Sequence, residues 1–170
     1  LIVECPRTMQ SDRAGDTMGS IINLGCDIAE IHHQYTAIHS ALFGASSYRL
    51  VIAAVTGRTA KTYQNHLQTL DQLQTRLSEL THEIPTVDAR AAVHQAEQLR
   101  SVLSEYATTL NSAIVSLRGI CAQLLRDEEN YREIPKGGQS AFNRDKISYD
   151  RVLLHLERLG RRLNQLFSRF

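Results

Sequence analysis

Proline is scarce in this sequence, and strand-like patterns are missing from it. Only three prolines occur, Pro6, Pro85 and Pro135, and the last two fall between periodic segments, where a helix breaker is expected. No segment alternates apolar and polar residues as a half-buried strand does. We therefore expect an all-α protein without β-strands.

Cysteines are also few, the net charge is close to zero, and long apolar runs are missing. The three cysteines, Cys5, Cys26 and Cys121, are too few and too scattered for a disulfide framework, which favours a reducing, cytoplasmic setting. The longest apolar run, Leu50 to Val55, falls well short of the roughly 18 residues that cross a bilayer. A formal net charge of +1 gives no overall attraction to nucleic acid. These scarcities argue against a membrane-spanning protein and a strongly basic nucleic-acid binder.

The chain does contain a heptad pattern along most of its length. Apolar residues recur at alternating steps of three and four, as in the seam of a coiled coil, over residues 17–43, 47–84, 86–133 and 140–170. Short connections between consecutive helices then predict an elongated antiparallel four-helix bundle of coiled-coil-like helices. We expect a flexible N-terminal tail over 1–16 and a single helical-bundle domain over 17–170.

The predicted helices differ in length, and this mismatch predicts an exposed tip. Counted outward from the turns at about 1.5 Å per residue, the first helix reaches only to about Gln72 of the second, and the fourth only back to about Ser104 of the third. The seam of the second helix beyond that level would be open to water. Its residues, the predicted partner-binding set, are Leu73, Leu77, Leu80 and Ile84. Because a helix gains most of its stability by burying its apolar face, we expect another chain or a second copy to cover them.

Two Glu-x-x-His motifs raise the possibility of a metal site. Di-iron helical bundles use this spacing to place a carboxylate and an imidazole on one metal, and the chain has Glu30 with His33 and Glu79 with His82. The heptad register places all four outside the seam, and Glu79 lies beyond the predicted reach of the first helix. We therefore expect solvated surface residues, with no metal and no cofactor.

His66 is the one histidine on a seam position. It could act as a pH-sensitive switch, or it could simply fix the register through one hydrogen bond, as a core Asn does in a coiled coil. The remaining histidines are expected to be surface or flanking residues; they are His32, His33, His39, His94 and His155. Cys121 and Cys26 fall at flanking and outward positions without a predictable His and acid beside them, so we expect no catalytic residue and no enzyme activity.

The last predicted helix carries a row of arginines. Residues 140–170 hold seven Lys/Arg against three Asp/Glu, and Arg144, Arg151 and Arg158 repeat every seven residues along one side, with Arg161, Arg162 and Arg169 nearby. Such a row suits an acidic partner helix, a phosphate backbone or anionic lipid, or it is simply a solvated face. Interleaved acidic residues and the lack of aromatic residues on that face argue against nucleic acid.

These patterns favour a non-enzymatic helical interaction module, an adaptor, tether or subunit of a larger coiled-coil assembly. Its partner would be a protein helix or a second copy of the chain, bound through the tip and through Arg151, Arg158 and Arg162. One alternative is a ligand- or signal-sensing four-helix bundle with a pocket at Leu50 to Val55. Another is a peripheral membrane or nucleic-acid binder that uses the basic fourth helix.

Overall fold

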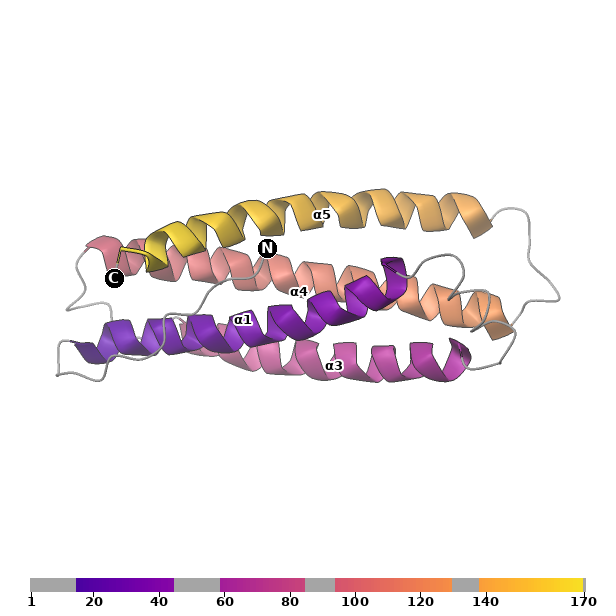
Figure 1. Cartoon of the computed structure of the whole chain (residues 1–170), viewed down its shortest axis with the longest axis horizontal. Coiled ribbons are helices and arrows are strands. Elements are labelled where there is room, and N and C mark those ends of the chain that lie inside the picture. Colours follow the sequence, from indigo (N-terminus) through magenta and orange to yellow (C-terminus); the bar gives the residue numbers. More distant parts are fainter. Residues whose placement is uncertain (1–14, 45–58, 85–93, 130–137, 170) are drawn as a thin grey trace.

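The computed structural model describes residues 15–44, 59–84, 94–129 and 138–169. Within these ranges the chain forms four α-helices and no strand, namely α1 (Gly15–Phe43), α3 (Thr59–Glu83), α4 (His94–Glu129) and α5 (Gly138–Phe167). They lie side by side along one long axis (Figure 1). The expectation of an all-helical bundle is confirmed. Helix α1 begins at Gly15, within the tail predicted over 1–16. The rest of that tail, 1–14, and the predicted helical stretches 47–58, 86–93 and 130–133 lie outside the described residues.

Helix α4 is the element on which the others pack. It makes its most extensive contacts with α3 and α5, and α1 packs against both α3 and α4. Two pairs of residues show how α3 lies along α4. Tyr63 near the start of α3 lies beside Cys121 near the end of α4, and Ile84 just after α3 lies beside Arg100 near the start of α4. Helix α4 therefore has neighbours on three of its sides.

The buried surface of α4 is accordingly wider than a heptad seam. The predicted seam residues from Ala96 to Ile120 are buried, but so are four residues beside them, Val102, Ala107, Ile114 and Cys121. Three of these, Ala107, Ile114 and Cys121, repeat every seven residues and form a second apolar row. The heptad seam expected for this helix was therefore too narrow for α4, because a helix with three neighbours buries a broad face.

The exposed tip predicted from the unequal helix lengths is also wrong. Leu73, Leu77 and Ile84 are 3%, 0% and 2% exposed within this one chain, and Leu80 is partly buried. The physical reason is the length of the neighbouring helix. Helix α1 has 29 residues and α3 has 25, and α1 lies alongside α3 up to the C-terminal end of α3 (Figure 1). Arg76 near that end pairs with Asp27 of α1 at 3.7 Å. Among the described residues of the tip, the chain itself covers Leu73, Leu77 and Ile84 fully and Leu80 in part.

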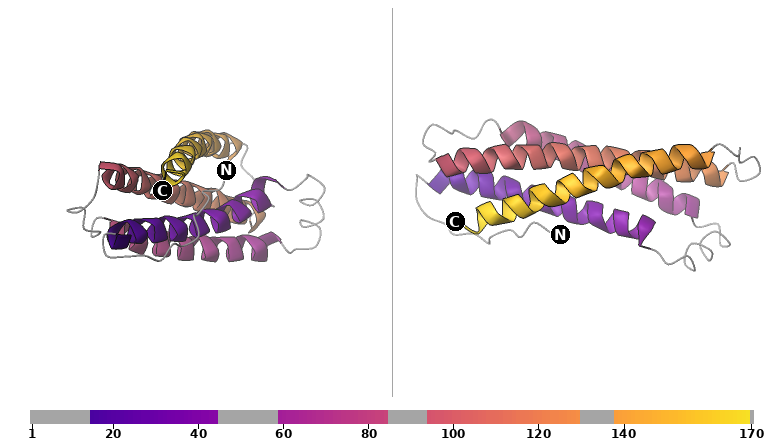
Figure 2. Two further views of the ribbon diagram at one scale, coloured as in Figure 1. Left: turned by 60° about the vertical axis from the view of Figure 1, so that its left-hand side comes forward. Right: turned by 90° about the horizontal axis from the view of Figure 1, so that it is seen from above.

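Large aromatic side chains bridge α1 and α5, which cross at an angle and approach each other closely in few places (Figure 2). At one end of α5, the ring of Phe167 fits against Gly25 of α1, where an added Cβ would come within 2.7 Å of the ring. Towards the other end, Tyr149 of α5 contacts Tyr35, His39 and Phe43 of α1. The space between the two helices is therefore filled by side chains from both.

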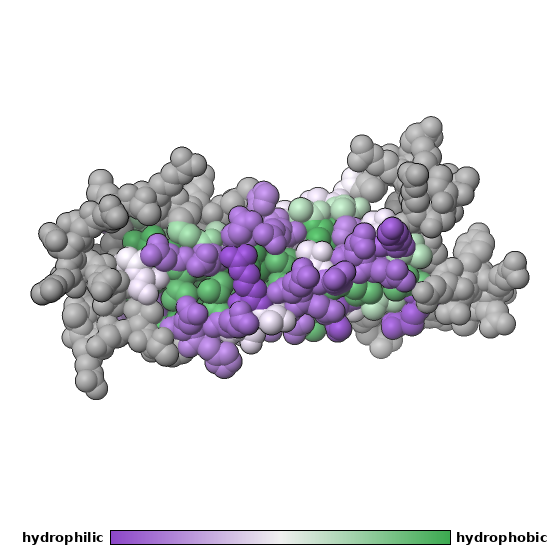
Figure 3. All heavy atoms as spheres, turned by 90° about the horizontal axis from the view of Figure 1, so that it is seen from below, coloured by the Kyte–Doolittle hydropathy of each residue, from purple (hydrophilic) through white to green (hydrophobic). Residues whose placement is uncertain are grey.

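Polar side chains cover much of the outer surface, with apolar side chains visible between them (Figure 3). Three large apolar residues of the described part are clearly exposed: Val115 on α4 at 46%, and Ile147 and Leu154 on α5 at 56% and 55%. None of the described helices is long and apolar enough to cross a membrane.

Two helical glycines provide a matched test of the packing between α1 and α5. Gly119 has no atom near the position of an added Cβ, so Gly119→Ala should raise the free energy of unfolding by about 0.5–1 kcal/mol through helix propensity. Gly25→Ala should instead lower it by about 1–2 kcal/mol, because the methyl group overlaps the buried Phe167 ring. Urea denaturation followed by circular dichroism measures both. In a Phe167→Ala background the Gly25→Ala change should become neutral or stabilising; a persistent penalty there would contradict this assignment.

Candidate functional site

A hydrogen-bonded polar cluster lies in the interior between α1 and α5. The hydroxyl groups of Tyr35 and Tyr149 form a short hydrogen bond, and Tyr149 Oη lies 2.8 Å from His39 Nδ1. Both tyrosines are buried, at 2% and 1% exposure, and His39 is partly buried. Burial raises the pKa of each tyrosine above its ordinary value, and for Tyr35 the neighbouring Tyr149 adds to the shift. The cluster is therefore a neutral network at physiological pH.

Aromatic stacking surrounds these hydrogen bonds. The His39 ring lies 5.1 Å from the Phe43 ring and 5.7 Å from the Tyr149 ring, and Phe43 also contacts Tyr149 at 5.9 Å. Burial lowers the pKa of His39, although Asp150 acts in the opposite direction. The aromatic surroundings therefore favour the uncharged form of the His39 imidazole.

His32 extends the cluster toward α4. Its ring packs edge-on against Tyr106 at 5.9 Å and stacks with Tyr35 at 6.2 Å. Its Nδ1 atom and the hydroxyl of Tyr106 are both buried and have no hydrogen-bond partner among the described residues. Burial, with a smaller contribution from His33, lowers the pKa of His32 to about 4.

The sequence predicted surface or flanking positions for His32 and His39, and both are partly buried beside the seam, so the flanking position applies. The missed pattern is a stripe of ring-bearing residues on one side of α1, spaced by three or four, formed by His32, Tyr35, His39 and Phe43. Only Tyr35 of this stripe belongs to the predicted seam. The rings of His39 and Phe43 lie beside Tyr149 of α5, and the ring of His32 packs against Tyr106 of α4. His33 and His155 are exposed, as expected, and the side chain of His94 lies outside the described part.

His66 does not behave as a register-fixing core residue. It is only half-buried, and within the described ranges it makes no hydrogen bond. Burial lowers its pKa, and no other cause contributes. The switching role remains a prediction.

The two described cysteines differ from each other. Cys121 is a free, fully buried thiol 3.5 Å from the carbonyl oxygen of Tyr63, and burial raises its pKa to about 11. A thiol of that pKa carries almost no thiolate at neutral pH, which fits the expected structural role. Cys26 is disulfide-bonded. A disulfide is typical of oxidising compartments and weighs against the reducing setting expected from the cysteine count.

The residues of the two Glu-x-x-His motifs do not converge. Glu30, His33, Glu79 and His82 are all exposed, on two different helices. Glu30 accepts a hydrogen bond from Gln34 at 2.8 Å. Among the described residues, no group of three or more His, Cys, Asp or Glu side chains is arranged to hold a metal ion.

Three of the predicted partner-binding residues, Arg151, Arg158 and Arg162, form an exposed row on the outer side of α5. In the described part of the chain none of them takes part in an ion pair, whereas Arg161 pairs with Glu157 and Lys146 with Asp150. The row lies on the same flank as His155, which approaches Glu105 of α4 at 3.4 Å. Ile147 and Leu154 lie beside the row and are more than half exposed.

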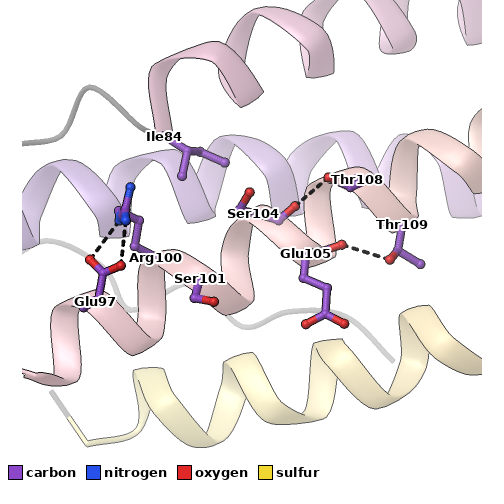
Figure 4. A pocket seen from close by; sticks show the side chains of 8 residues that line it. All are labelled: Ile84, Glu97, Arg100, Ser101, Ser104, Glu105, Thr108 and Thr109. Atoms are coloured by element: carbon purple, nitrogen blue, oxygen red, sulfur yellow. Dashed lines mark hydrogen bonds and ion pairs between the residues drawn. The ribbon is translucent and has the colours of Figure 1, made fainter.

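A shallow groove of about 480 Å³ runs along the outer side of α4 (Figure 4). Ile84, the residue after the end of α3, closes one side, and seven polar side chains of α4 line the rest: Glu97, Arg100, Ser101, Ser104, Glu105, Thr108 and Thr109. Many of these groups are already engaged, since Arg100 binds Glu97 and both threonines donate to carbonyl oxygens of their own helix. The groove therefore does not present the convergent free polar groups of a small-molecule site.

No known protein family, characterised protein or solved structure is significantly similar to this chain.

Acid should destabilise the protein through His32. The folded-state pKa of about 4 lies below the ordinary 6.5, so the unfolded chain binds more protons between these values, and stability falls as the pH drops from 6.5 to 4. At about 1.4 kcal/mol per pKa unit, less an allowance for partial exposure, the loss attributable to His32 is about 2 kcal/mol.

His32→Leu should remove that part of the pH dependence and be neutral or stabilising at pH 7, because it removes the unpartnered buried Nδ1. Urea denaturation at pH 7.5, 6 and 4.5 measures the effect. His33→Gln is the matched control at an exposed neighbour and should leave the wild-type pH dependence intact. Equal slopes for wild type and His32→Leu would show that His32 does not titrate in this way.

Proposed function

We propose that this chain is a non-enzymatic interaction module, an antiparallel bundle with coiled-coil-like seams that docks a partner helix on the outer side of α5. The observation that supports it is the surface formed by Ile147, Arg151, Leu154, Arg158 and Arg162, which we call the α5 outer face. It combines unpaired arginines with large exposed apolar side chains.

The spacing on this face suits a helix. Ile147, Arg151, Leu154 and Arg158 follow one another at steps of four, three and four, so they form one line along α5. A helix lying along that line would bury Ile147 and Leu154, each contributing roughly 1.5–3 kcal/mol when fully covered. Acidic residues flanking its apolar stripe would meet the arginines, which favours correct orientation and fast association.

Charge selects the partner. Two copies of the α5 outer face would bring arginine rows together, so a symmetric dimer through this face is disfavoured and an acidic amphipathic helix of another protein is favoured. A phosphate backbone would satisfy the arginines but would leave Ile147 and Leu154 exposed. An anionic membrane surface could use both, but two exposed apolar residues are a small area for stable membrane binding.

The tip, the Leu50 to Val55 segment and the location in the cell were also considered for function. The tip leucines no longer support partner binding, because this chain buries them itself. The pocket of a ligand-sensing bundle was placed at Leu50 to Val55, which lies outside the described residues. A cytoplasmic location stays a prediction.

The binding test uses a synthetic helical peptide with a leucine stripe flanked by glutamates, and fluorescence anisotropy at 50 mM and 500 mM salt. Wild type should bind, more weakly at high salt because exposed charges are screened. The double variant Arg151→Gln with Arg158→Gln should weaken binding by about tenfold or more at low salt. Leu154→Gln should weaken it by a similar factor at both salt concentrations.

The matched control removes the same charge elsewhere. Arg76→Gln with Arg118→Gln, on α3 and α4, breaks two exposed ion pairs and should leave peptide affinity within twofold of wild type. Equal loss in both double variants would mean that only net charge matters and would overturn the proposal. Retention on phosphatidylserine vesicles without peptide binding would favour the membrane alternative, and self-association abolished by Leu154→Gln would favour a second copy.

A further inference from the structure

The outer face of α5 is one side of a helix whose inner side carries Tyr149. We propose that the cluster of Tyr35, His39 and Tyr149 is a proton-sensitive latch that holds the N-terminal half of α5 against α1 and releases it when His39 is protonated. This inference does not depend on what binds the outer face.

The three side chains form a chain of hydrogen bonds when His39 is neutral. With neutral His39, the Tyr35 hydroxyl donates to Tyr149 Oη, and the Tyr149 hydroxyl donates to His39 Nδ1 at 2.8 Å. Every hydrogen of the three groups that faces the cluster then has an acceptor. For these three groups, it is the one arrangement that leaves neither buried hydroxyl hydrogen, of Tyr35 or of Tyr149, unpaired.

Protonation of His39 breaks that arrangement. Nδ1 then carries a hydrogen and can only donate to Tyr149, so the hydrogen of Tyr149 must turn to Tyr35 or remain unpaired. If it turns to Tyr35, the hydrogen of Tyr35 loses its acceptor instead. Within the described residues neither tyrosine has another partner. One buried hydroxyl is therefore left without a hydrogen bond in either case, which penalises the closed state.

The charged groups around the latch do not compensate for this loss. Asp150 of α5 favours the protonated imidazole and Lys146 of α5 opposes it, and these two residues are paired with each other at 3.0 Å. From α4, Tyr106 packs against His32, two turns away from His39 on α1. The net effect of the surroundings keeps the pKa of His39 below its ordinary value, with burial as the largest cause.

The helices make the latch effective because few other contacts join them at this level. Helix α5 packs extensively on α4, whereas α1 and α5 meet mainly through the rings of Tyr149 and Phe167. Loss of the Tyr149 contacts therefore frees the N-terminal half of α5 from α1 while the rest of the bundle stays packed.

Hydrogen exchange with mass spectrometry tests the latch at pH 7.5 and 5.5, after correction for intrinsic exchange rates. His39 has an ordinary pKa in the open state and a lower pKa in the closed state. The equilibrium constant for opening should therefore rise by up to about tenfold when the pH falls from 7.5 to 5.5. Peptides covering Ile147 to Leu154 should therefore lose protection severalfold at pH 5.5, whereas peptides covering Leu70 to Leu77 of α3 should change far less.

The variants separate a latch from general acid sensitivity. All variants are compared in a His32→Leu background, which removes the separate acid sensitivity of His32. In that background His39→Asn keeps an acceptor for Tyr149 but cannot be protonated near neutral pH, so it should abolish the pH response of α5. His33→Asn, at an exposed neighbouring histidine, should leave the response unchanged. A pH response that persists in His39→Asn, or no response in wild type, would overturn the proposal.

Imidazole NMR on the intact wild-type protein covers the case in which His39→Asn fails to fold. His39 should titrate below its ordinary range, and Tyr149→Phe should move it upward by removing the donor to Nδ1. An unshifted His39 in wild type, or no upward movement in Tyr149→Phe, would also overturn the latch.

Discussion

The bundle depends on the three-sided burial of α4. A helix with a single apolar seam can satisfy one or two neighbours, but α4 packs against α1, α3 and α5. The second apolar row, Ala107, Ile114 and Cys121, supplies the additional surface. It is also built of small and medium side chains, which lets a third helix approach without overpacking. The positions of the other helices, and hence both the interior polar cluster and the α5 outer face, follow from this shared support.

Helix α5 contributes to both the polar cluster and the α5 outer face, and its two sides are under different physical constraints. On the inner side, Tyr149 is dry and its hydrogen bonds must be complete, because an unpaired buried hydroxyl costs about 1–3 kcal/mol. On the outer side, the arginines remain in water and their charges act at long range with little effect on stability. A helix that is strictly constrained on one side and free to vary on the other suits a module whose binding surface must change without loss of the fold.

The sequence predicted the helical class, the positions of the helices that the structure describes, and most seam residues, because heptad periodicity depends only on local spacing. It did not predict the second row on α4, since Val102, Ala107 and Ile114 become core residues only when a third neighbour is present. It gave His32 and His39 only as surface or flanking residues and did not predict their aromatic contacts, because these are made with Tyr106 and Tyr149, which are distant in sequence. The burial of the tip leucines was not predicted, because the overlap of the helices depends on where each helix begins and ends, and a heptad pattern places those ends only approximately. Arg151, Arg158 and Arg162 are exposed, as expected for the face that flanks the seam of α5.

The bridge between Tyr35 and Tyr149 also has a kinetic consequence. These residues are 114 positions apart in the chain, whereas the contacts of α3 with α4 and of α4 with α5 join neighbours in sequence. Closing so large a loop is entropically unfavourable until the intervening helices have assembled. We therefore expect α3, α4 and α5 to associate first and α1 to dock last. The aromatic junction would then complete folding, and its rupture would be an early event in unfolding.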